Sequence, residues 1–220
     1  MTGDLVPGFE PAPDNKVTEV VVSPDGATVY AGGAFSTLGG QPRYRAGAVH
    51  ASTGRATDFA PTGSGGNAVT IGLSPDGERL FVGTQNNTLF AYDATVSNNP
   101  VWSIKTSGDT QAIAVSDDEM RIGGHFSQIV TGKIPRPFIA SLDPVDGSVN
   151  DWNPKCAGPK MGVGRWCTTA HTSTPADSSP ASTPSSSVPM LASPRSPDPS
   201  RSCTAERVGM GHSSVNSCRR

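Results

Sequence analysis

The chain has 220 residues, a net charge of −2 and a pI of about 6.0, so it lacks the basic footprint of a nucleic-acid-binding protein. Aromatic residues make up only 6%, whereas 25 glycines and 20 prolines are typical of short strands joined by many turns. No apolar run reaches the roughly 18 residues that a membrane helix requires. We therefore expect neither a membrane span nor a nucleic-acid partner.

The N-terminal stretch MTGDLVPGFEPAPDN has neither the basic region nor the apolar run of a secretory signal peptide. It aligns with residues 52–66, which close the first of the repeated units described below. Residues 1–14 are therefore predicted to be the last strand of a preceding or closing unit. Two explanations stay open: the strand completes a ring of units, or the start codon has been assigned too late, which the lack of a signal peptide favours.

Three units follow, and each opens with an alternation of β-branched and small residues that predicts a half-buried strand, at 17–23, 68–74 and 111–116. A tight turn comes next. Asp-Gly suits such a turn because glycine adopts positive φ at no steric cost and aspartate tolerates it, and the pairs are Asp25-Gly26 and Asp76-Gly77. A second strand is predicted at 27–33, 79–84 and 120–124.

The second strand of the outer units ends in a shared motif, Gly-Gly-x-Phe-Ser. Its residues are Gly32, Gly33 and Phe35 in unit one, and Gly123, Gly124 and Phe126 in unit three. Unit two departs from the motif and keeps only Gly83. Glycine lets backbones approach closely, as they must where strands crowd near an axis.

Each unit continues with a third strand, at 45–51, 88–94 and 137–143, a second turn, and a fourth strand that ends in an aromatic residue. These aromatics, predicted to pack between neighbouring units, are Phe59, Trp102 and Trp152. Four short antiparallel strands per 40–50 residues are typical of a β-propeller blade. The predicted fold class is all-β: an incomplete propeller of about three four-stranded blades at 15–66, 67–109 and 110–163.

This pattern resembles the repeats of a family of secreted bacterial β-propeller proteins, whose units run S-x-D-G and then Y-[AV]-G-G-x-F-[ST]. The resemblance covers residues 1–163 and is most specific in units one and three. It implies an extracellular location for the intact protein. The function that we expect is that of a non-catalytic propeller module that binds protein or glycan.

Residues 164–220 change character, being rich in Ser, Pro, Thr and Arg, and predict a disordered tail. A second hypothesis is favoured: the tail is an out-of-frame translation of a fourth blade. Shifted codons from Thr168 onward permit D-G-T-H-L-Y-A-G-G-L-F-T, which agrees with Asp25–Ser36 at most positions. The four cysteines, at 156, 167, 203 and 218, form no CxxC pair and are interpreted as incidental thiols.

No catalytic, cofactor or metal site is predicted. The acid-rich segment 143–151 lacks the spacing of a calcium loop and is interpreted as a hairpin turn, as is 116–119. His125 has no second ligand nearby in sequence. Besides a binding module, two alternatives stay open: a truncated or frameshifted product with no function of its own, whose open blade edges invite self-association, and a fragment of a propeller-fold enzyme.

Overall fold

A computed structural model describes residues 7–63, 65–95 and 98–154. The predictions for residues 1–6 and for the tail at 164–220, including its reading frame, fall outside the described residues. Nearly all regular structure in the described part is β, and every strand pairing is antiparallel. Among these residues no helix is long and apolar enough to cross a membrane.

Unit one forms a three-stranded sheet in the order β1-β2-β5. Its strands are β1 (Val17–Val22), β2 (Thr28–Gly33) and β5 (Ala46–His50). After β2 the chain forms a small hairpin of two strands with two residues each, β3 (Thr37–Leu38) and β4 (Gln41–Pro42). The runs of β-branched residues in β1 and β2 favour the extended backbone.

Unit two forms a complete four-stranded meander. Its strands are β6 (Ala68–Leu73), β7 (Arg79–Thr84), β8 (Thr88–Asp93) and β9 (Pro100–Lys105). Unit three repeats the plan of unit one, in the order β10-β11-β14 with a second small hairpin. Its elements are β10 (Thr110–Val115), β11 (Met120–Gly124), β12 (Gln128–Ile129), the short 3₁₀ helix η1 (Thr131–Lys133), β13 (Ile134–Pro135) and β14 (Ile139–Leu142).

The all-β fold class is confirmed, but the outer units carry less of a fourth strand than the sequence predicts. In unit one the outer pairing is the single bridge between Val49 and Ala56, and in unit three it is the bridge between Leu142 and Val149. In both units an arginine that directly follows the small hairpin donates to the next carbonyl oxygen, of Thr57 or Asn150, where a longer ladder would place a strand amide.

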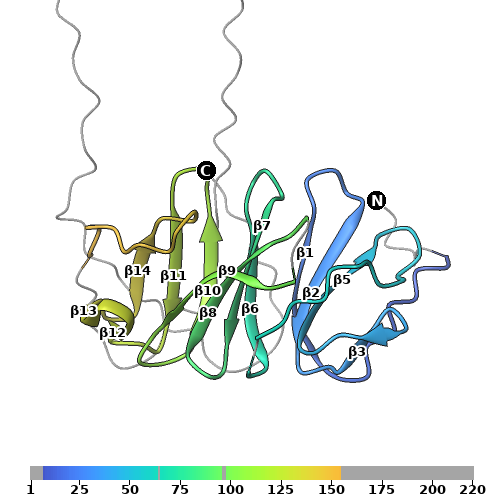
Figure 1. Ribbon diagram of the computed structural model, residues 1–220, viewed down its shortest axis with the longest axis horizontal. Helices are drawn as coiled ribbons and strands as arrows, with labels where there is room; N and C mark the ends of the chain where they lie inside the picture. The colour runs from blue at the N-terminus through green and yellow to red at the C-terminus, as the bar shows by residue number, and fades with distance from the viewer. Residues whose placement is uncertain (1–6, 64, 96–97, 155–220) are drawn as a thin grey trace, which may run out of the picture.

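The three sheets lie side by side in chain order, with unit two between the other two (Figure 1). The core is built between the sheets. One buried cluster joins units one and two, and its members include Tyr30, Ala48, Phe59, Ile71, Leu80, Val82 and Tyr92. A second cluster joins units two and three, and its members include Phe81, Leu89, Ala91, Met120, Ile122, Phe126 and Leu142. Side chains that alternate along the strands of unit two therefore serve two different interfaces.

Candidate functional site

The Ser-Pro-Asp-Gly turn of unit one is closed by its aspartate. Asp25 accepts hydrogen bonds from the Ser23 hydroxyl at 2.5 Å and from the Ala27 amide at 2.9 Å. These two donors, the hydroxyl foremost, lower the pKa of the Asp25 carboxyl. Gly26 follows with a φ of +72°, a conformation that costs glycine little.

Unit two repeats this turn. Asp76 accepts from the Ser74 hydroxyl and from the Glu78 amide, the latter at 3.0 Å, and Gly77 has a φ of +80°. The Ser74 hydroxyl is the main cause of the lowered pKa of Asp76. Both aspartate carboxylates therefore accept hydrogen bonds within their own turns, and their role there is structural.

The second glycine of each Gly-Gly pair faces backbone of its own unit. A Cβ at Gly33 would lie 2.1 Å from the carbonyl oxygen of Lys16, and one at Gly124 would lie 2.0 Å from that of Asp109. Neither gap admits a methyl group. The close approach occurs where the first strand begins beside the end of the second, at an irregularity in the register of each pair. The carbonyl oxygens of Lys16 and Asp109 also accept the amides of Ala34 and His125 there.

The first glycine lies against the next unit. A Cβ at Gly32 would lie 2.6 Å from Cγ2 of Ile71. One at Gly83 would lie 2.9 Å from Cγ2 of Thr70 in its own unit and 3.2 Å from Cβ of Thr110 in the next. Gly123, the counterpart in unit three, is buried and pairs with Ala112 and Ile139. The glycines of units one and two thus set the distance between adjacent units.

The phenylalanine of Gly-Gly-x-Phe-Ser anchors the small hairpin that follows it. Phe35 is 1% exposed and clusters with Leu38, whereas Phe126 is 0% exposed and clusters with Ile129. Leu38 and Ile129 belong to β3 and β12, so each hairpin is fastened to its unit by one apolar pair.

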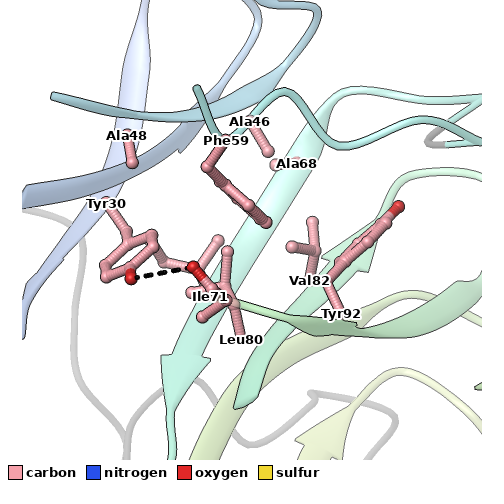
Figure 2. Packing of buried hydrophobic residues seen from close by; sticks show 10 residues of the cluster. Tyr30, Ala46, Ala48, Phe59, Ala68, Ile71, Leu80, Val82 and Tyr92 are labelled. Atoms are coloured by element: carbon pink, nitrogen blue, oxygen red, sulfur yellow. Dashed lines mark hydrogen bonds between the residues drawn. The ribbon is translucent and has the colours of Figure 1, made fainter. Parts of the chain in front are cut away.

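The aromatic residues that close units one and two lie between units. Phe59 stands edge-on to Tyr30 of unit one and to Tyr92 of unit two, at centroid distances of 5.7 and 6.2 Å (Figure 2). Trp102 lies 5.8 Å from Phe81 and covers Gly147 of unit three, where a Cβ would meet its ring at 2.8 Å. The two edge-to-face pairs of Phe59 add to the free energy gained by burying its ring.

Trp152 closes unit three in a different environment. The guanidinium of Arg121 lies 4.9 Å from its ring centroid, at the β11 position where β2 and β7 carry Tyr30 and Phe81. Arg121 also pairs with Glu119 at 2.7 Å. Unit three therefore presents a cation–π pair where the other units present two aromatic rings.

Two arginines that sequence reasoning missed hold the outer edges of units one and three. Arg43 donates to the carbonyl oxygen of Thr57, and Arg136 donates to that of Asn150 at 2.8 Å. Each follows a proline and reaches a segment 14 residues further on. The recurring Pro-Arg dipeptide, at 42–43 and 135–136, is the sequence signal that would have found them.

The side of unit one that faces away from unit two is incompletely covered. Val20 and Val22 of β1 are 55% and 54% exposed. Their equivalents in β6 are Ile71, which is 2% exposed, and Leu73, which packs against the cluster between units one and two. We call the surface formed by Val20 and Val22 the open face.

Within the described ranges, His, Cys, Asp and Glu side chains form no group of three or more that could hold a metal ion. His125 Nδ1 lies 2.9 Å from an Asp109 carboxylate oxygen at the surface. In the acid-rich segment, Asp143 and Asp146 each accept the amide of the residue two positions on, at 2.7 and 2.8 Å, as in a hairpin turn.

No protein-family model and no curated protein matches the sequence. Solved structures do match the fold. The chain superposes on the WD40 repeats of RRP9 with a TM-score of 0.52 at 12% identity, over 70% of this chain and 42% of that one. For U3-55K the TM-score is 0.53 at 12% identity, over 70% and 43%.

The computationally designed Ika4 protein matches with a TM-score of 0.55 at 14% identity, over 76% of this chain and 88% of that one. At these identities the likeness shows the fold alone, which is that of WD40-type propeller repeats. The chain spans about two fifths of the length of the RRP9 and U3-55K structures.

Proposed function

We propose that this chain is a non-catalytic β-propeller module that binds another protein through its open face. The observation that carries the proposal is the exposure of Val20 and Val22 at positions whose counterparts in units two and three pack into interfaces between sheets. An exposed apolar strip that continues a pattern of buried interfaces favours a protein partner.

A protein is favoured over a glycan because the strip is aliphatic. Glycan recognition by this surface would need polar partners, whereas Val20 and Val22 offer only methyl groups. A catalytic role has little support, since the turn aspartates Asp25 and Asp76 already bond their own hairpins. We further propose, on the resemblance of the repeat alone, that the intact protein acts outside the cell, which fractionation would test.

Site-specific photo-crosslinking tests the protein-binding role. Val20 is replaced by a benzophenone amino acid, and Val145, which is 65% exposed on a turn of unit three, is the matched control position. The proposal predicts protein adducts from position 20 well above those from position 145. Equal labelling at both positions would contradict it, as would glycan-array binding that Val20→Asp leaves unchanged.

A further inference from the structure

Residues 7–11 pack on unit one through Phe9. Phe9 packs against the cluster of Ala31, Phe35, Leu38 and Val49. The segment is fastened by its backbone, because the Gly39 amide donates to the Pro11 carbonyl at 2.6 Å and the Glu10 amide donates to the Thr53 carbonyl at 3.2 Å. Phe9 thus occupies on unit one the place that Phe59 occupies on unit two.

The equivalence follows from the strand registers. Val49 pairs with Val29, just as Tyr92 pairs with Leu80, so Val49 and Tyr92 hold the same position in their units. Phe59 contacts Tyr92, and Phe9 packs on the cluster that contains Val49. Phe9 therefore holds the place of an aromatic residue that ends a preceding unit, as Phe59 ends unit one. The described residues contain no sheet of such a preceding unit.

The opposite end of the array presents the complementary side. Trp152 is the closing aromatic of unit three, and no further unit covers it within the described residues. Arg121 lies over its ring, so the pair holds the positions that Tyr30 and Phe59 hold toward unit two. An end that presents a closing aromatic and an end that receives one can associate head to tail.

We propose that the open face of unit one receives unit three of a second copy of this chain, and that residues 7–11 block this contact by occupying the place of the incoming Trp152. The inference rests on the proposed function of the open face. Two copies of three units would give six blades, within the four to eight of closed propellers. A head-to-tail contact that closes in this way ends at a dimer instead of continuing as a filament.

The block is steric and apolar. Phe9 and the incoming Trp152 would take the same place against Val49, and both cannot fit in a close-packed interface. Val20 and Val22 would be covered by β10 and β11 of the second copy, as β6 is contacted by β1 and β2 of unit one. Displacing residues 7–11 also costs the contacts that hold Phe9.

Sedimentation velocity on the full chain tests the proposal, at loading concentrations of about 1–100 μM. Phe9→Asp undocks the segment, because a carboxylate does not remain in an apolar cluster. We expect the unmodified chain to associate only weakly and to be mainly monomeric in this range, and F9D to dimerise at least about tenfold more tightly. F9D/W152A and F9D/V20D should return to monomers, whereas the matched control F9D/V145D should dimerise like F9D.

F9D that stays monomeric would overturn the proposal, and so would dimers that persist in F9D/W152A or F9D/V20D. If F9D loses its cooperative melt, Phe9→Ala is measured in its place with the same partner substitutions and the same expectations. Crosslinking at position 20 to other proteins, together with a monomeric F9D, would overturn the second-copy partner and leave the protein-binding function standing. If position 20 gives no more protein adducts than position 145 and F9D stays monomeric, both the protein-binding function and the second-copy partner are contradicted.

Discussion

Val20 and Ile71 occupy the same position on the first strands of consecutive units, yet Val20 is 55% exposed and Ile71 is 2% exposed. The difference arises from their neighbours, because the methyl group Cγ2 of Ile71 packs against Gly32 of unit one, and no sheet among the described residues lies beside Val20 in the same way. The same residue pattern therefore serves as core in one unit and as surface in another.

Phe59 should be a main source of stability for the contact between units one and two. Its ring is 8% exposed and meets aromatic rings of both units. Phe59→Ala is expected to cost about 3–5 kcal/mol of the free energy of unfolding. Urea unfolding followed by circular dichroism measures this loss, and a change below about 1 kcal/mol would show that the ring is not part of the core.

Gly33 and Gly124 should resist replacement by alanine. The added methyl groups would lie 2.1 and 2.0 Å from backbone carbonyl oxygens, which cannot move without shifting the strand ends. We expect each substitution to cost about 1–3 kcal/mol or more. The control is Gly65→Ala, whose methyl group would meet only an Asn86 side-chain nitrogen at 3.2 Å. Thermal melts should separate the two kinds of variant, and equal melting temperatures would contradict the packing argument.

Arg43→Lys should weaken the outer edge of unit one despite keeping the charge. Arg43 donates to both Pro42 and Thr57 carbonyl oxygens, which an ammonium group cannot span in the same geometry. The loss of the Thr57 hydrogen bond is expected to cost about 1 kcal/mol, and Arg43→Ala somewhat more. Faster amide exchange at residues 55–57 in both variants is the predicted signature, and unchanged exchange there would count against the clamp.

Stability should fall in acid through the turn aspartates. The pKa of Asp25 and of Asp76 is lowered in the fold, chiefly by the Ser23 and Ser74 hydroxyls. A folded-state pKa below the unfolded value of about 3.9 means that the ionised carboxylates stabilise the fold above that pH. This stabilisation is lost as the pH falls through the folded values.

Urea midpoints between pH 6 and pH 2 measure the acid effect. The double variant Asp25→Asn, Asp76→Asn should show a shallower decline than the unmodified chain. It should not be flat, because Asp14 and Asp146 also have a lowered pKa from backbone amides. Parallel curves for the two proteins would contradict the assignment of these turns.

Local patterns predicted most of the strands, because alternation and turn chemistry act within a few residues. The second strand of unit two, for instance, was expected at 79–84 and is observed at Arg79–Thr84. The sequence wrongly predicted four strands for the outer units, which have three-stranded sheets. The Arg43 and Arg136 contacts at their outer edges join residues 14 positions apart, beyond the reach of local patterns.

The candidate site was less accessible to sequence reasoning. Val20 is as apolar as its counterparts, so its residue type carries no sign that it is exposed. Only the placement of the sheets separates Val20 from Ile71. The block by Phe9 likewise depends on where residues 7–11 dock, although their alignment with the end of unit one hinted at it.

Amide exchange in β1 and β6, followed by mass spectrometry, tests most directly whether unit one has an open face. The two strands are equivalent in sequence pattern, but β6 is packed on both sides and β1 on one. Local opening should therefore be easier in β1, and we predict exchange at least about tenfold faster there than in β6. Equal protection of the two strands in the monomer would contradict the account, because it would require that β1 is covered as completely as β6.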